Sequence, residues 1–230
     1  MKPVDTPKSL VEQTYDILVD AICVGLLKPG ERLTQDAVAA RLNVSRQPVN
    51  TALGMLKANR LVESTGRRGV VVAPLDPDLF RDIYDVRTSL EPLAVRLAGR
   101  HSLLPEDRRE GEAIIAEGWA ARRADDVAGM VRADVAFHSL LYRLSGNRVI
   151  EETMRVYWIH IRRAMTRILR SAADYPDTVW DQHERILVAI GAGRSEEAAE
   201  ILRDHLTGGF AAGSGGLAFL PTSDGYQGKI

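Results

Sequence analysis

Apolar residues recur at helical spacing through the first sixty positions, and turn residues separate the periodic stretches. The spacing predicts one helix over residues 9–26 and two shorter helices over residues 34–42 and 45–59. Residues 61–72 are rich in valine and enclose the polar run STGRRG, a pattern typical of a β-hairpin. Two short helices joined by a tight turn and followed by a hairpin predict a winged helix-turn-helix.

Beyond a short proline-containing linker, the apolar pattern is helical throughout and shows no strand alternation. The predicted helices cover residues 78–100, 105–123, 126–145, 148–172, 177–192 and 195–210. We therefore expect a mainly α protein, in which an N-terminal winged helix-turn-helix precedes an all-α antiparallel helical bundle.

The domain boundaries follow from the same changes of pattern. The winged helix-turn-helix is predicted over residues 1–74, a linker over residues 75–80, and the helical domain over residues 81–210. Residues 211–230 are rich in glycine and serine, which predicts a flexible tail.

Charge is divided unevenly between the two domains, although the net charge of the 230 residues is only −1. Residues 33–74 hold six basic and two acidic side chains, whereas residues 75–210 hold 19 basic and 23 acidic ones. A basic first domain and a mildly acidic second one indicate two separate tasks. The single cysteine excludes an intramolecular disulfide, and no signal peptide or membrane-length apolar run is visible, so we expect a cytoplasmic protein with no membrane partner.

The third predicted helix has the two faces that a DNA recognition helix needs. Apolar residues lie on one face, whereas Arg46, Gln47 and Asn50 lie on the other, where they can reach base edges. Arg67 and Arg68 at the hairpin tip can reach phosphates or a minor groove. Helix-turn-helix geometry is also common in proteins that bind no DNA, so the spacing alone leaves both interpretations open.

A resemblance to the DNA-binding domain of the GntR family of bacterial transcription regulators is carried by LTQDAVAARLNVSRQPVNTALGMLKANRLVESTGRRGVVVAP, with VSRQPVNTAL as its most specific phrase. The resemblance covers about the first third of the chain and implies operator DNA as a partner. The expected DNA-contacting residues are Thr34, Gln35, Ser45, Arg46, Gln47, Asn50, Arg67 and Arg68.

This chain departs from the family pattern at three positions. The family usually has an arginine at the position of Asn50, and often a basic residue at that of Gly54. Asp36 stands where some members have an arginine that touches DNA. The recognition helix is therefore less basic than is usual, and Asn50 can instead read an adenine edge by a bidentate contact.

Asp134 and His138 in RADVAFHSLLYRLSGN are four residues apart, so they share one helical face beside an apolar stripe. His183 and His205 lie on the apolar-facing sides of two other predicted helices. Three imidazoles and one carboxylate suit Zn²⁺, Ni²⁺ or another divalent transition ion. A histidine on an apolar face is more often a core residue, so the spacing leaves both interpretations open.

Three phrases of the second half, IYDVRTSLEPLAVRLA, DVAFHSLLYRLSGN and DQHERILVAIGAGRSEEAAEILRDHL, resemble the all-helical effector-binding (FCD) domain of the FadR-type branch of the GntR family. In the metal-binding members of this branch, one Asp and three His from these phrases hold a metal at the floor of the ligand pocket. The resemblance implies that Asp134, His138, His183 and His205 bind a divalent transition metal, most simply zinc or nickel.

The resemblance also implies a binding site for a small organic acid. Arg87 falls in the phrase that resembles the first pocket-lining helix, where a cation beside a metal suits a carboxylate. Asn147 is the second residue expected to contact the effector. The alternative for Arg87 is an ion pair with Glu91, one helical turn further on.

Together the two halves predict a ligand-responsive transcription regulator, and in particular a repressor. A homodimer presents two recognition helices to a pseudo-palindromic operator, and the acid favours a dimer geometry that releases the DNA. Activation is the other possible sign of regulation. Two other functions remain open: a metalloenzyme that uses the three His and one Asp on a small acid, and a DNA-binding protein whose second half only dimerises.

Overall fold

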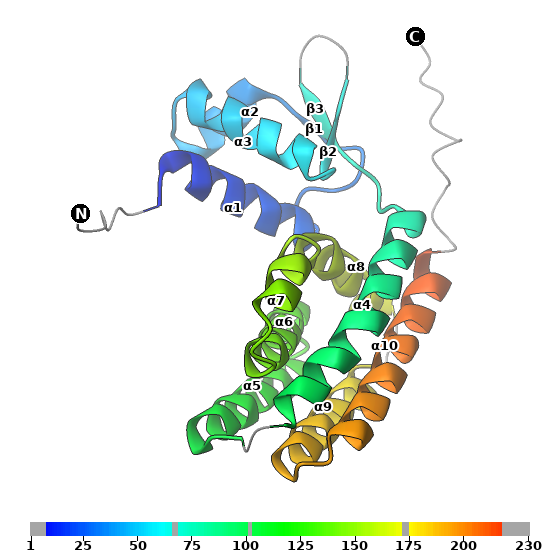
Figure 1. Ribbon diagram of the computed structural model, residues 1–230. Coiled ribbons are helices and arrows are strands. Elements are labelled where there is room, and N and C mark those ends of the chain that lie inside the picture. Colours follow the sequence, from blue (N-terminus) through cyan, green and yellow to red (C-terminus); the bar gives the residue numbers. More distant parts are fainter. Residues whose placement is uncertain (1–7, 66–68, 101–102, 172–174, 218–230) are drawn as a thin grey trace, which may run out of the picture. The chain divides into compact units, whose positions relative to one another are not determined.

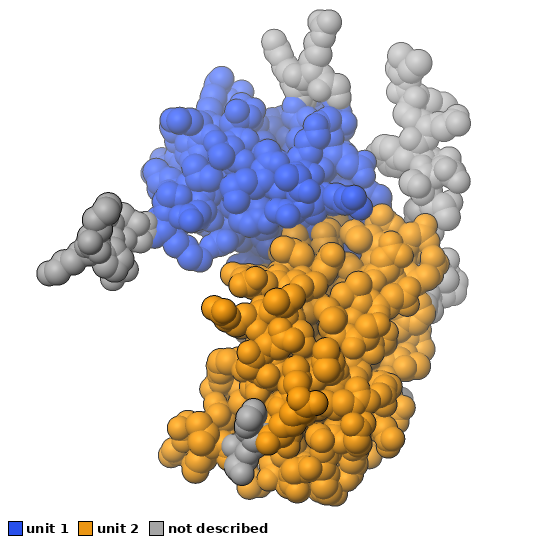
Figure 2. Space-filling model, in the orientation of Figure 1, with its two compact units in different colours: residues 1–75 blue, residues 76–230 orange. Residues whose placement is uncertain are grey.

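The computed structural model describes residues 8–65, 69–100, 103–171 and 175–217. It divides the chain into two compact units, Met1–Leu75 and Asp76–Ile230, which are coloured separately in Figure 2. The second unit opens directly with a helix at Pro77, so helical structure begins inside the segment 75–80 that the sequence predicts as a linker. Its N-cap is Asp76, whose side chain accepts hydrogen bonds from two backbone N–H groups.

The first unit is the predicted winged helix-turn-helix (Figure 1). Its elements are α1 (Leu10–Cys23), β1 (Arg32–Leu33), α2 (Gln35–Leu42), α3 (Arg46–Ala58), β2 (Val62–Ser64) and β3 (Val70–Val72). The antiparallel pair β2–β3 confirms the predicted hairpin. The sequence analysis missed β1, which pairs with β3 and completes a sheet of order β1-β3-β2, because two residues are too few to show alternation.

Seven helices make up the described part of the second unit, which confirms the all-α prediction. They are α4 (Pro77–Ala98), α5 (Pro105–Arg123), α6 (Val127–Leu144), α7 (Arg148–Arg155), α8 (Trp158–Ser171), α9 (Tyr175–Gly191) and α10 (Ser195–Leu217). The single helix predicted over residues 148–172 is wrong, because the chain turns between α7 and α8. Tyr157 N–H donates to the carbonyl of Met154, three residues back, and the sequence has no glycine or proline there to signal the break.

Helix α10 continues seven residues past position 210, into the segment that the sequence predicts as a flexible tail. Contacts with α4 explain the extension. Phe210 stacks on Phe80, with ring centroids 5.9 Å apart, and also contacts Tyr84. Gly213 lies so close to Phe80 that an added Cβ would be 2.6 Å from its ring. Glycines that look flexible in the sequence thus permit close helix packing.

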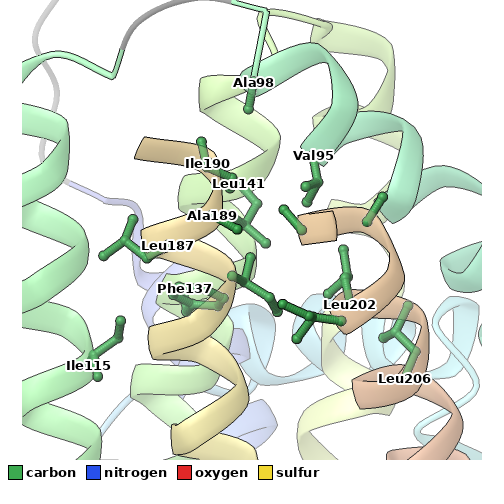
Figure 3. Close-up of a cluster of buried hydrophobic side chains, with 14 residues drawn as sticks. Val95, Ala98, Ile115, Phe137, Leu141, Leu187, Ala189, Ile190, Leu202 and Leu206 are labelled. Carbon is green, nitrogen blue, oxygen red and sulfur yellow. The ribbon is translucent and has the colours of Figure 1, made fainter. Parts of the chain in front are cut away.

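A buried apolar cluster joins α4, α5, α6, α9 and α10 (Figure 3). Its members include Phe137 and Leu141 of α6, Leu187 and Ile190 of α9, and Leu202 of α10. Because each of these helices turns its apolar stripe to the same core, side chains next to the stripe are brought together as well. This packing sets the positions of the polar side chains described below.

Close approach between α5 and α9 depends on Gly118. A Cβ at this position would lie 2.3 Å from the ring of the buried Trp180. We expect Gly118→Ala to lower the free energy of unfolding by about 1–3 kcal/mol, because the rigid indole cannot move aside. The matched control is Gly208→Ala on α10, where a Cβ meets no atom within 4 Å.

In the control, the helix propensity of alanine should raise the free energy of unfolding by about 0.5–1 kcal/mol. Urea unfolding followed by circular dichroism measures both variants. Equal stability of the two variants would show that α5 and α9 are not packed as described.

Candidate DNA-reading face and candidate metal centre

The two faces of α3 are those expected for a recognition helix. Val49, Leu53 and Leu56 are buried against the rest of the first unit. Arg46 and Asn50 are exposed on the other side, as is Gln47. The helix therefore offers polar side chains to solvent on one side and is anchored by its apolar side.

Exposed side chains of α2 and α3 pair with each other. Arg46 Nε lies 2.6 Å from Asp36 Oδ1, and Gln35 Nε2 donates to Asn50 Oδ1 at 2.7 Å. Asp36, the acidic departure from the family pattern, thus contacts the arginine expected to read DNA. Because both members of the ion pair are largely exposed, it contributes little stability and can separate readily.

Of the four other residues that were predicted to contact DNA, the structure describes two. Thr34 caps α2, its hydroxyl accepting from Ala37 N–H at 3.3 Å, and Ser45 is the N-cap of α3 without a side-chain capping bond. Arg67 and Arg68 lie outside the described residues.

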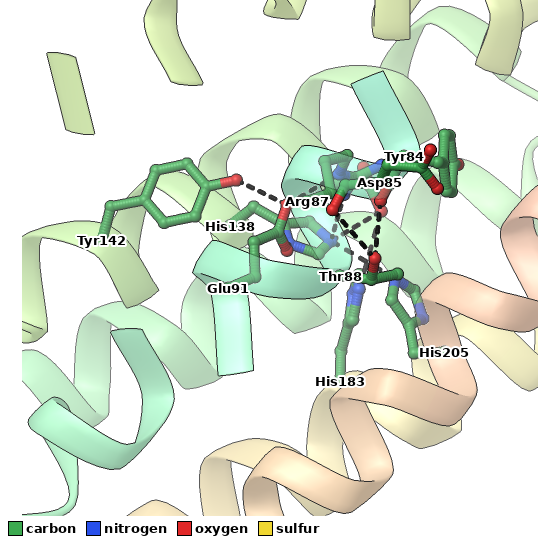
Figure 4. A network of polar contacts seen from close by, with 10 residues as sticks. Tyr84, Asp85, Arg87, Thr88, Glu91, His138, Tyr142, His183 and His205 are labelled. Carbon is green, nitrogen blue, oxygen red and sulfur yellow. Dashed lines mark hydrogen bonds and ion pairs between the residues drawn. The ribbon is translucent and has the colours of Figure 1, made fainter. Parts of the chain in front are cut away.

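The four predicted metal ligands come together in the second unit, where we call them the donor cluster. Asp134 and His138 extend from α6, His183 from α9 and His205 from α10, and all four are buried. One potential ligand atom from each lies within 4.8 Å of all the others. Figure 4 shows His183 and His205 pointing toward His138.

Distances within the donor cluster are too long for strong direct hydrogen bonds. Asp134 Oδ1 lies 3.5 Å from His183 Nε2 and 3.8 Å from His138 Nε2. Nε2 of His138 and Nε2 of His205 are 3.3 Å apart. The four side chains thus surround one point, and only His138 and His205 are within hydrogen-bond distance of each other.

Two members of the donor cluster have buried polar atoms that lack any hydrogen-bond partner. These are both carboxylate oxygens of Asp134 and both ring nitrogens of His183. Leaving such a group unpaired costs about 1–3 kcal/mol, so native proteins rarely do so without a reason. Three imidazoles and a carboxylate are a donor set that transition metals prefer, and the residues present therefore fit a divalent cation.

The pKa shifts within the donor cluster are those expected of residues that bind a divalent cation. Burial raises the pKa of Asp134, because a lone buried carboxylate is disfavoured. Burial, with the neighbouring histidines, lowers the pKa of His183 and of His205 well below 6.5. Both rings are therefore neutral at pH 7, which is the form that ligates metals.

Arg87 makes the predicted alternative ion pair with Glu91, and it also contacts the donor cluster. Its Nη2 lies 3.5 Å from His138 Nε2, and its Nε donates to Glu91 Oε1 at 2.6 Å. Its guanidinium carbon is 5.0 Å from the ring centre of Tyr84 and 5.6 Å from that of Trp158. The ion pair of Arg87 is therefore confirmed, and its part in binding an effector stays a prediction.

Sequence reasoning missed two residues of this network, Tyr142 and Gln182, and the contact of Glu91 with His138; Figure 4 draws the network in part. Glu91 accepts from Tyr142 Oη at 2.8 Å and lies 2.7 Å from His138 Nδ1. Gln182 Oε1 lies 3.2 Å from His205 Nδ1. Burial alone raises the pKa of Glu91, but Arg87 and His138 together hold it below its usual range, so the group is a carboxylate. The spacing of Arg87 and Glu91 signalled only their mutual ion pair.

Asn147, the other residue predicted to contact the effector, lies in the turn between α6 and α7. It is the N-cap of α7, where its side-chain oxygen accepts from Val149 N–H at 3.1 Å. Its backbone N–H donates to Ser145 Oγ. Among the described residues, its hydrogen bonds thus serve the turn between α6 and α7, a common use of asparagine at this type of position.

Over the described ranges, no helix is both long enough and apolar enough to cross a membrane.

Comparison with known proteins agrees with both halves of this description. The chain matches the family of bacterial regulatory proteins called the gntR family over residues 10–72, and the FCD domain over residues 82–208. It is 28% identical over 210 residues to the uncharacterized HTH-type transcriptional regulator YdhC of Bacillus subtilis (strain 168), a match that covers 87% of this chain and 89% of that protein.

Another relative is the probable D-xylose utilization operon transcriptional repressor of Paenarthrobacter nicotinovorans, 29% identical over 230 residues, with 98% of this chain and 93% of that protein covered. The crystal structure of a GntR transcriptional regulator from Rhodococcus sp. RHA1 superposes with a TM-score of 0.77 at 26% identity, covering 93% of this chain and all of that one. These relatives are regulators and not enzymes, which sets the metalloenzyme alternative aside. By its two matched domains, the chain belongs to the GntR family of bacterial transcription regulators, in the branch that carries an FCD domain.

Proposed function

We propose that this regulator is a repressor that releases its operator when a small organic acid binds beside a metal in the helical domain. The observation that carries the proposal is the donor cluster, with its unpaired Asp134 and His183 atoms, next to the buried cation Arg87. The names of two relatives support repression over activation, since one from Paenarthrobacter nicotinovorans and one from Escherichia coli are described as transcriptional repressors.

In this proposal Asp134, His138, His183 and His205 hold a divalent transition metal, zinc or nickel. When bound, such a metal supplies a Lewis-acidic centre for an anionic oxygen. The protein side chains supply the rest: a buried set of three imidazoles, a buried carboxylate without a hydrogen-bond partner, and surroundings that exclude bulk water.

Arg87 supplies the second recognition element for an acid. A guanidinium binds a carboxylate through its N–H edge, often with two parallel hydrogen bonds. Tyr84 and Trp158 lie near the faces of Arg87, and Glu91 fixes its Nε. Its terminal Nη2, beside the donor cluster, is the part that is positioned to meet an anion.

Release of DNA follows from linkage between the two domains. A homodimer places two copies of α3 on successive half-sites, and the acid binds more tightly to a geometry that misplaces them. Because linkage is reciprocal, operator DNA must weaken acid binding by the same factor by which the acid weakens DNA binding.

Arg46 provides the first test of this proposal. Arg46→Ala should weaken specific operator binding by about 1–3 kcal/mol, because a bidentate contact to a base edge is lost. Lys57→Ala is the matched control, since it removes one exposed positive charge from the other end of α3. Gel shifts on DNA selected from a random pool measure both affinity and sequence preference.

Arg46→Ala should relax the preference at one base position, whereas Lys57→Ala should keep the preference intact. Unchanged affinity and preference for Arg46→Ala would remove Arg46 from the set of DNA-reading residues.

His183 provides the second test, which separates the metal site from DNA binding. His183→Ala should reduce the bound metal severely, because only three protein ligands remain. The control is His160→Ala, which removes a histidine of α8 outside the donor cluster. Elemental analysis and operator-release assays with a panel of small carboxylic acids would be run on both variants.

We expect His183→Ala to bind operator almost normally but to ignore the acid that releases the wild type. Full metal occupancy in this variant would remove His183 from the ligand set. A normal response of metal-stripped wild type would assign the metal a purely structural part, and no response of metal-loaded wild type to any acid would favour the alternative of a helical domain that only dimerises.

A further inference from the structure

Two of the three histidines in the donor cluster have a side-chain oxygen within hydrogen-bond distance of their Nδ1 atom. His138 Nδ1 lies 2.7 Å from Glu91 Oε2, and His205 Nδ1 lies 3.2 Å from Gln182 Oε1. The third, His183, has no such partner on either nitrogen. The acceptors differ in charge, since Glu91 is a fully buried carboxylate and Gln182 is a half-buried neutral amide.

These contacts determine which ring nitrogen carries the hydrogen. An ionised carboxylate and an amide oxygen only accept hydrogen bonds, so Nδ1 of both His138 and His205 must be the donor. In His205, whose pKa burial lowers, Nε2 then presents a lone pair. The two Nε2 atoms are 3.3 Å apart, and the guanidinium of Arg87, whose Nη2 lies 3.5 Å from His138 Nε2, is the cation beside them.

Glu91 also holds the neighbouring cation. Its Oε1 accepts from Arg87 Nε at 2.6 Å and from Tyr142 Oη at 2.8 Å, while Oε2 faces His138. The same carboxylate therefore fixes a predicted metal ligand and the predicted anchor for the acid. Its negative charge, together with that of Asp134, offsets the charges of a guanidinium and a dication placed side by side.

We propose that Glu91 is a positioning residue that holds His138 ready for the metal and Arg87 ready for the acid, and that Gln182 is its weaker, neutral counterpart on His205. This inference rests on the proposed function of the donor cluster as a metal site. A carboxylate that accepts from the outer nitrogen of a ligating imidazole orients the ring and increases its basicity. Charge at positions 91 and 182 therefore sets metal affinity.

The test uses the full-length protein, stripped of metal and titrated with zinc against a chromogenic chelator. Glu91→Gln keeps the side-chain shape but removes the charge, and should weaken zinc binding about 10–100-fold. Gln182→Glu places a carboxylate on His205 and should tighten zinc binding several-fold. A gain of affinity at a half-buried position is not the result of damage to the fold.

Tyr142→Phe is the matched control for loss of a buried hydrogen bond to Glu91. It removes the 2.8 Å bond of the hydroxyl but leaves the carboxylate on His138. We expect zinc affinity within about threefold of wild type, even if the variant unfolds at a lower temperature. Thermal unfolding of every metal-free variant separates changes in stability from changes in affinity.

A second readout needs no metal. The ¹⁵N shifts of the imidazoles in metal-free wild type should show His138 and His205 with the hydrogen on Nδ1. In Glu91→Gln the signal of His138 should change, while that of His205 should stay.

The possible outcomes separate the two proposals. If wild type binds no zinc, the proposed metal site fails, and the tautomer of His138 still reports on Glu91. If wild type binds zinc, and Glu91→Gln and Gln182→Glu bind it with the same affinity, the metal site stands and the positioning role of Glu91 is overturned. Equal losses in Tyr142→Phe and Glu91→Gln would overturn it too. If Glu91→Gln does not fold, Gln182→Glu decides, and unchanged affinity there contradicts the inference.

Discussion

A buried carboxylate without a hydrogen bond is the constraint on which the rest of the helical unit depends. Both oxygens of Asp134 are enclosed and unpaired, and so are both ring nitrogens of His183. Unpaired buried groups disfavour folding, and the raised pKa of Asp134 reflects how poorly burial suits its charge. A cation at the centre of the donor cluster would satisfy the carboxylate of Asp134 and one ring nitrogen of His183, so folding and metal binding favour the same arrangement.

The apolar core makes that arrangement possible. Phe137 lies next to His138 on α6, and its ring stacks on His183 with centroids 4.1 Å apart. Trp180 contacts His183 edge-on from within the same helix. Because these rings are packed among buried neighbours, the imidazoles have little freedom to turn away. Close packing of α5 against α9 at Gly118 holds Trp180 in place and therefore supports the site indirectly.

Much of the fold could be predicted from the sequence, because long amphipathic helices and a valine-rich hairpin have clear periods. The helix break near Tyr157 could not be predicted, since no glycine or proline marks it. Nor could the extension of α10, which depends on the tertiary contact of Gly213 with Phe80. The pairing of Asp134 with His138 followed from their spacing. That His183 and His205 join them was implied by family resemblance, because helices distant in sequence have no common period.

The contacts that Glu91 and Gln182 make with the histidines could not be predicted from the sequence, for the same reason. Glu91 and His138 are 47 positions apart, and Gln182 and His205 are 23 apart. The side chain of Asn147, a residue predicted to contact the effector, caps α7, and its part in effector binding stays a prediction. Resemblance thus pointed to the four residues of the donor cluster, whereas only the structure showed which side chains contact them.

The central claim is that one metal ion is bound by three imidazoles and one carboxylate inside the helical unit. X-ray absorption spectroscopy at the metal edge of the purified, loaded protein tests it most directly. The account predicts one ion per chain, a first shell of nitrogen and oxygen at about 2.0–2.2 Å, and multiple scattering from three imidazoles. A shell of water oxygens with one imidazole or none would contradict it.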